Sequence, residues 1–146
     1  TPLYSSAASD VYKRQEQGGE QTDGRVLIVS FGALTDQALG AAQALCDANF
    51  SATVVDPHWV VPTAESLLEL ARDFDLIVTI EDNGVHGGAG SRLHYDLSQA
   101  GIDVPVRNLG VPQEFLAHAS RGEVLEELGL DVETVAQTVV GYAEKL

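Results

Sequence analysis

The chain has 146 residues, of which 45% are hydrophobic, 21% charged and 6% aromatic. This length fits one domain, or one domain with a tail. Eight Lys and Arg residues against 22 Asp and Glu residues give a net charge of -14. That balance excludes the basic face that DNA or RNA binding requires, and it disfavours docking on an anionic membrane. The single cysteine, Cys46, excludes an internal disulfide, and we expect a cytoplasmic protein.

Residues 1–24 differ in composition from the rest of the chain. They are rich in Ser, Ala, Gln, Gly and Glu and have little apolar periodicity. Such a segment cannot bury enough apolar area to offset its ordering entropy. We therefore expect a disordered tail or linker, followed by one domain over residues 25–146. Residues 1–15 are either foreign to the natural protein or an ordinary cleaved or tagged start, and the sequence leaves both readings open.

Predicted strands and helices alternate along residues 25–146. Apolar runs predict strands at residues 26–31, 52–55, 75–80 and 104–109. Apolar periodicity predicts helices at residues 35–48, 63–71, 91–101, 113–117, 121–127 and 132–144. We expect Thr35 or Asp36 to cap the first helix and Thr63 to cap the second. This alternation predicts a three-layer α/β/α fold, with a mostly parallel sheet of about five strands that leaves room for one antiparallel strand.

The loop at residues 83–91 contains four glycines between a predicted strand and a predicted helix. This context can bind a phosphate, but the loop lacks the third glycine of GxGxxG and the lysine of a P-loop. Glu81 and Asp82 beside it would repel a phosphate. Because glycine allows backbones to approach closely, we expect another domain or subunit to pack here. Ser91 is expected to cap the following helix.

The remaining polar residues show no spacing typical of a metal or catalytic site. His86 and His94 are eight residues apart, which is too far for the i, i+4 pairing of a helical metal site, and His58 and His118 stand alone. Ordinary surface or packing roles are the default for these histidines. Cys46 is expected to be a small buried core residue.

Several segments together resemble the C-terminal domain of the 1-deoxy-D-xylulose-5-phosphate synthase family, over about residues 25–146. The matching segments lie at residues 54–62, 79–83, 87–91, 104–112, 115–118 and 128–131. The glycine signature at 87–91 is shared by transketolase-type C-terminal domains generally. Asn-Leu-Gly-Val-Pro at 108–112 and Leu-Gly-Leu-Asp at 128–131 point to the synthase. His58 and His86 depart from the family pattern, so the resemblance assigns them no role.

The resemblance implies part of a transferase that uses thiamine diphosphate and Mg²⁺ to condense pyruvate with D-glyceraldehyde 3-phosphate, a step in isoprenoid, thiamine and pyridoxal synthesis. The family's cofactor and metal motifs lie in upstream domains. The resemblance therefore implies no catalytic, cofactor-binding or metal-binding residue in this chain, which should be inactive alone. It implies packing on the pyrimidine domain and a homodimer interface through five residues: Glu81, Asn83, Gly87, Gly88 and Ser91.

Other readings keep the fold and change the function. One is the C-terminal domain of a 2-oxoacid dehydrogenase β subunit or of transketolase, against which residues 104–131 argue. Another is a free-standing regulatory module that binds anions, which would require a native start near Thr22 and no catalytic domain upstream. A pure protein-interaction domain would need an exposed apolar patch, which a sequence cannot show.

Overall fold

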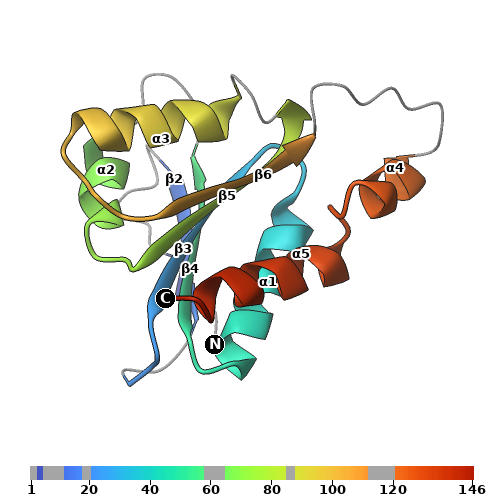
Figure 1. The fold of residues 1–146 in the computed structure, drawn as a ribbon, viewed down its shortest axis with the longest axis horizontal. Coiled ribbons are helices and arrows are strands. Elements are labelled where there is room, and N and C mark those ends of the chain that lie inside the picture. Colours follow the sequence, from blue (N-terminus) through green and yellow to red (C-terminus); the bar gives the residue numbers. More distant parts are fainter. Residues whose placement is uncertain (1–2, 5–11, 18–20, 58–64, 85–87, 112–120) are drawn as a thin grey trace.

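The computed structural model describes residues 3–4, 12–17, 21–57, 65–84, 88–111 and 121–146 (Figure 1). Strands precede and then alternate with helices along these ranges. In chain order they are β1 (Leu3–Tyr4), β2 (Tyr12–Gln17), β3 (Arg25–Phe31), α1 (Thr35–Asp47), β4 (Ser51–Pro57), α2 (Glu65–Ala71), β5 (Leu76–Gly84), α3 (Ala89–Gln99), β6 (Val106–Val111), α4 (Arg121–Glu127) and α5 (Val132–Ala143).

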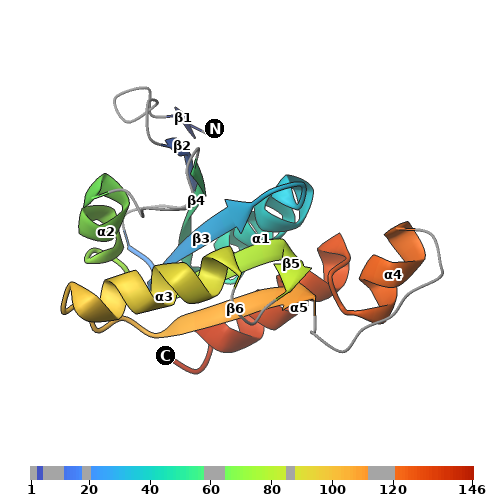
Figure 2. The ribbon, with the colours of Figure 1, turned by 90° about the horizontal axis from the view of Figure 1, so that it is seen from above.

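The described strands form one sheet in the order β1-β2-β4-β3-β5-β6. Strands β4, β3, β5 and β6 are parallel, whereas β2 is antiparallel to β4 and β1 is antiparallel to β2. The antiparallel pair lies at the opposite edge of the sheet from β6 (Figure 2). The predicted α/β class and mostly parallel sheet are confirmed, with six described strands in place of about five.

Strands β1 and β2 fall within residues 1–24, where composition predicts a disordered tail. That expectation is wrong for residues 3–4 and 12–17, which the structure assigns to the sheet. The whole of β2 pairs with β4, from Tyr12 opposite Pro57 to Gln17 opposite Ala52. Backbone hydrogen bonds hold such a strand, and composition does not report them. The division of the chain at residues 24 and 25 stays a prediction.

The central strand β3 is buried on both faces because helices cover both sides of the sheet. Val26 and Ile28 pack into the core shared with α1 and α5, while Leu27 and Val29 pack into the core shared with α2 and α3. Figure 1 shows the sheet between these two helix layers. This double burial explains why the strand reads as a continuous apolar run.

Helices α1 and α5 begin differently from each other. The N-cap of α1 is Leu34, which makes no side-chain cap bond and is fully buried. The prediction that Thr35 or Asp36 caps this helix is therefore wrong, because core burial of Leu34 sets where the helix starts. Asp131 caps α5, and its carboxylate accepts the N–H of Thr134 at 3.1 Å.

Several further expectations can be compared with the structure. Cys46 is half-buried, so the expectation of a buried core residue is wrong. His94 is exposed on α3. Pro105 immediately precedes β6, which lies at one edge of the sheet. Outside the described residues lie Thr63, the histidines at 58, 86 and 118 and the helix predicted at 113–117.

Within the described ranges, no helix is both long enough and apolar enough to cross a bilayer.

Candidate functional site at the glycine loop

Glu81 joins the carboxyl-terminal part of β5 to the start of α3. Its side chain is fully buried. Oε2 accepts the N–H of Ala89 at 2.8 Å, and Oε1 accepts the N–H of Gly90 at 3.1 Å. The first N–H groups of a helix have no partner within the helix, and a negative charge beside them is stabilising. Glu81 therefore supplies the cap of α3 from the neighbouring strand.

The capping position of α3 is Gly88, not Ser91. Gly88 has extended backbone angles, φ -79 and ψ -174, and no side-chain cap bond is made there. Ser91 is the third residue of the helix and is half-buried. The prediction that Ser91 caps the helix is wrong, because the long side chain of Glu81 reaches these amides from β5.

Gly90 allows α3 to approach the sheet closely. A Cβ added at Gly90 would overlap Thr79 Oγ1 and would lie 2.9 Å from Asn108 Oδ1. Thr79 and Asn108 are opposite each other in the β5–β6 register, and the Thr79 hydroxyl donates to Asn108 Oδ1 at 2.6 Å. Only a residue without a side chain fits above this polar pair.

Asp82 contacts the loop that follows β3. Gly32 in that loop has a positive φ of 86°, and a Cβ added there would lie 3.0 Å from Asp82 Oδ1. Neighbouring residues of a strand point to opposite faces of the sheet. The two adjacent acids therefore serve different contacts: Glu81 holds α3, and Asp82 lies against the β3–α1 loop.

The geometry disfavours an anion at the start of α3. The amides that a phosphate would use here already donate to a buried carboxylate. Among the described residues, no three His, Cys, Asp or Glu side chains are grouped as metal ligands would be. The start of α3 thus does not fit a diphosphate.

The structure brings together three of the five predicted interface residues: Glu81, Gly88 and Ser91 meet at the start of α3. Asn83 belongs to the last part of β5. Gly87 lies outside the described residues. Sequence analysis missed Thr79, Gly90 and Asn108, although Thr79 and Glu81 are polar residues two apart that follow the apolar start of β5. That spacing places both on one face of β5.

The chain belongs to the transketolase C-terminal domain family. The model of this family, described as "Transketolase, C-terminal domain", matches residues 19–135. The fold agrees with a solved structure described as "Split gene transketolase, inactive beta4 tetramer". The superposition has a TM-score of 0.72 and 32% sequence identity, and it covers 86% of this chain and 41% of that chain.

Curated relatives carry a more specific name. The chain is 89% identical over 131 residues to a 1-deoxy-D-xylulose-5-phosphate synthase of Corynebacterium jeikeium (strain K411), a match that covers 90% of this chain and 21% of that protein. It is 54% identical over 117 residues to the synthase of Rhodococcus jostii (strain RHA1), covering 80% of this chain and 18% of that protein. The chain thus spans about a fifth of the length of these relatives.

Proposed function

We propose that this chain is the C-terminal domain of a 1-deoxy-D-xylulose-5-phosphate synthase, the transferase that condenses pyruvate with D-glyceraldehyde 3-phosphate. The observation that carries the proposal is the 89% identity with the Corynebacterium jeikeium synthase over 131 residues. The fold adds support, since it superposes on a transketolase structure with a TM-score of 0.72 and 32% sequence identity. The reaction belongs to the whole protein, in the cytoplasm, with upstream domains that supply the catalytic groups.

Within that protein the domain has a structural role at the glycine loop. Asn83, Gly87, Gly88 and Ser91 are the proposed contact residues towards the pyrimidine domain and the homodimer interface. Glu81 acts differently, because its buried carboxylate is already bonded to Ala89 and Gly90. It positions the end of the loop and does not touch the neighbour directly.

Thiamine diphosphate and Mg²⁺ belong to the upstream domains in this proposal. The start of α3 supports this, since Glu81 occupies its first amides. The same contact argues against a free-standing anion-binding module, which would need those amides free. When bound upstream, the cofactor supplies the carbanion chemistry, while this domain supplies packing.

A chimeric enzyme tests the proposal. Residues 25–146 of this chain replace the corresponding part of the Corynebacterium jeikeium synthase, and formation of 1-deoxy-D-xylulose 5-phosphate is measured. We expect turnover close to that of the parent enzyme. A chimera that is folded and dimeric but forms no product would contradict the proposal.

The interface role is tested in the same chimera with Gly88→Leu. Position 88 has extended backbone angles that leucine also adopts, so the variant domain should fold. We expect weaker dimerisation in analytical ultracentrifugation and lower turnover. The matched control is Ser98→Leu, at an exposed position of the same helix, which should change neither. If the two variants dimerise and turn over equally, the glycine loop is not part of the interface.

A further inference from the structure

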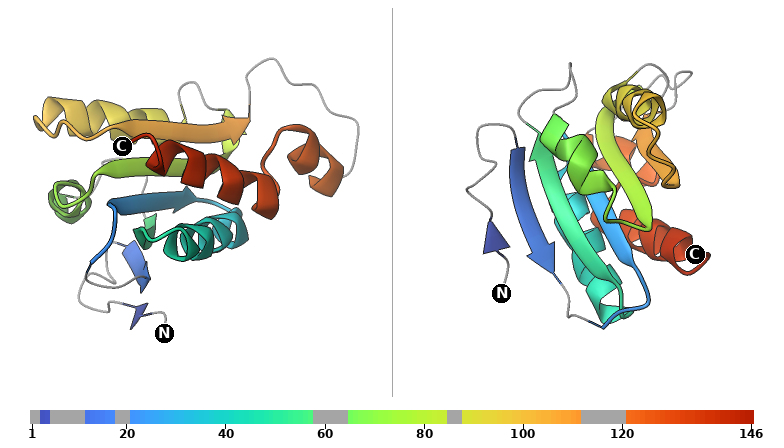
Figure 3. Two further views of the ribbon diagram at one scale, coloured as in Figure 1. Left: turned by 60° about the horizontal axis from the view of Figure 1, so that its bottom comes forward. Right: turned by 90° about the vertical axis from the view of Figure 1, so that its left-hand side faces the viewer.

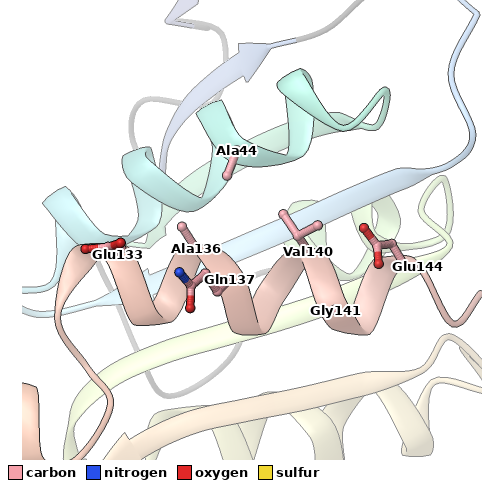
Figure 4. A pocket seen from close by; sticks show the side chains of 7 residues that line it. All are labelled: Ala44, Glu133, Ala136, Gln137, Val140, Gly141 and Glu144. Carbon is pink, nitrogen blue, oxygen red and sulfur yellow. The ribbon is translucent and has the colours of Figure 1, made fainter.

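Helices α1 and α5 lie side by side on one face of the sheet (Figure 3). Between them is an open groove with a volume of about 380 Å³. Most of its lining is small or apolar, namely Ala44 of α1 and Ala136, Val140 and Gly141 of α5, and the polar side chain of Gln137 lies among them. Glu133 and Glu144 also line it, towards its two ends (Figure 4). We call this feature the α1/α5 groove.

Short side chains line the groove on both helices. The two helices approach closely where α5 begins, because a Cβ added at Gly40 would lie 2.5 Å from Val132 Cγ1. Farther along, a Cβ added at Gly141 would meet no atom within 4 Å. In Figure 4, Ala44 points towards α5 while Ala136 and Val140 point towards α1. These short side chains leave the space between the helix surfaces unfilled.

The walls of the α1/α5 groove carry acidic groups. Neither α1 nor α5 contains a Lys or Arg, and the last turn of each lacks a basic residue although the dipole of a helix favours a cation there. Exposed acids stand at these ends instead, Asp47 on α1 and Glu144 beyond α5. Exposed Lys145 is the nearest base in sequence. The groove therefore combines an apolar floor with a negative rim.

We propose that the α1/α5 groove is a docking site for a cationic amphipathic helix of another protein. A helix in a groove places its residues i, i+3, i+4 and i+7 on an apolar floor. The acidic side chains at the rim favour positively charged residues on the two sides of that helix. Glu133 and Glu144 are 11 residues apart, or about 16 Å along the helix axis. The partner helix should therefore carry Lys or Arg residues about 11 positions apart, with small or apolar residues between them.

The negative charge of the groove favours a cationic helix over a second copy of the chain as its occupant. Two copies meeting at this groove would set Glu133 and Glu144 against the same acids. A chain with a net charge of -14 would also repel most acidic surfaces at low salt. The length of the rim, about three turns of α5, matches an extended helix better than a compact ligand.

A pair of synthetic peptides tests the proposal with the full chain. The probe is a helical peptide of about 16 residues with a Leu and Ala stripe and two Lys residues about 11 positions apart. The matched peptide carries Glu in place of both Lys residues. We expect the Lys peptide alone to shift the amide resonances of Ala136, Val140 and Gly141 in the ¹⁵N-labelled chain. Equal shifts with both peptides, shifts confined to other faces, or none with either, would overturn the proposal.

A double variant tests the role of the rim. Glu133→Gln with Glu144→Gln should weaken binding of the Lys peptide by roughly 3- to 10-fold and reduce its salt dependence, as expected for two exposed charge pairs. Glu126→Gln with Glu127→Gln on α4 is the control, since both are exposed and do not line the groove. Circular dichroism checks that each variant keeps its helices. Equal loss of affinity in the two double variants would show general charge attraction and reject the groove.

Discussion

The Glu81 carboxylate accepts the N–H of Gly90 at 3.1 Å, and the same oxygen would lie 3.1 Å from any Cβ placed on Gly90. The buried acid and the glycine therefore depend on each other. Glu81 reaches the first amides of α3 only because nothing stands between the helix and β5. This contact joins strand and helix into one unit and fixes both ends of the glycine loop.

Gly90→Ala should destabilise the chain by about 1–3 kcal/mol, the usual effect of adding a methyl group to a filled space. The new Cβ would overlap Thr79 Oγ1 and approach Asn108 Oδ1, so α3 must move away from the sheet. Urea denaturation measures the change in the free energy of unfolding. Gly141→Ala is the matched control, because its Cβ meets no atom within 4 Å. The control should raise stability by about 0.5–1 kcal/mol, since alanine favours a helix. Equal effects would contradict this account of Gly90.

Glu81→Gln should lower the free energy of unfolding by about 1–3 kcal/mol, because one acceptor becomes an NH₂ donor that faces a backbone N–H. The side chain keeps its length, so the change isolates the hydrogen bond. Amide hydrogen exchange should become faster at Ala89 or Gly90 while the amides of β3 keep their protection. Glu69→Gln is the control, since its contact with Arg72 is an exposed pair at 3.6 Å and such pairs contribute about 0–1 kcal/mol. Unchanged exchange at both α3 amides would refute the capping role.

The pKa of the Asp131 carboxyl is lowered from its ordinary value near 3.8, because the hydroxyl and the backbone N–H of Thr134 both donate to it. The folded state therefore binds this proton more weakly than the unfolded state. The contribution of the cap is present above pH 3.8 and is lost as the pH falls through the lower folded pKa.

Asp131→Asn keeps a good N-cap acceptor and removes the titrating group. The stability advantage of the original chain over this variant should shrink as the pH falls below 3.8. Thermal denaturation of both chains across that range measures it. An advantage that stays constant with pH would show that the Asp131 carboxylate adds nothing to the cap beyond what an amide adds.

The class of fold could be predicted from the sequence because β3 and β5 are buried on both faces and read as apolar runs. Strand β2 could not, since its residues Tyr12–Gln17 are mostly polar and backbone pairing with β4 holds them. The N-cap of α1 could not be predicted from the sequence for a related reason. Burial of Leu34 in the core sets the first turn, and a nearby Thr or Asp does not.

The glycine loop could be singled out from the sequence, whereas its role as an interface stays a prediction and its contacts could not be foreseen. The loop follows the third predicted strand, and Glu81, Gly88 and Ser91 do meet at the start of α3. The close contact of Gly90 with Thr79 and Asn108 depends on the register between β5 and β6. Strand register is set by packing over the whole sheet, so no local motif reveals it.

Ser30→Ala should leave the free energy of unfolding unchanged or raise it by up to about 1 kcal/mol. Ser30 is fully buried in β3, and its Oγ has no hydrogen-bond partner among the described residues. Burying a hydroxyl without a hydrogen-bond partner costs desolvation free energy. The alanine side chain has no hydroxyl, so the substitution removes this cost. Thr79→Val is the contrasting variant, because it deletes a buried hydroxyl that does donate, to Asn108 at 2.6 Å. That change should cost about 0.5–1.5 kcal/mol. Urea denaturation of the pair separates the two cases, and a loss at Ser30 as large as the loss at Thr79 would mean that the Ser30 hydroxyl is bonded in solution.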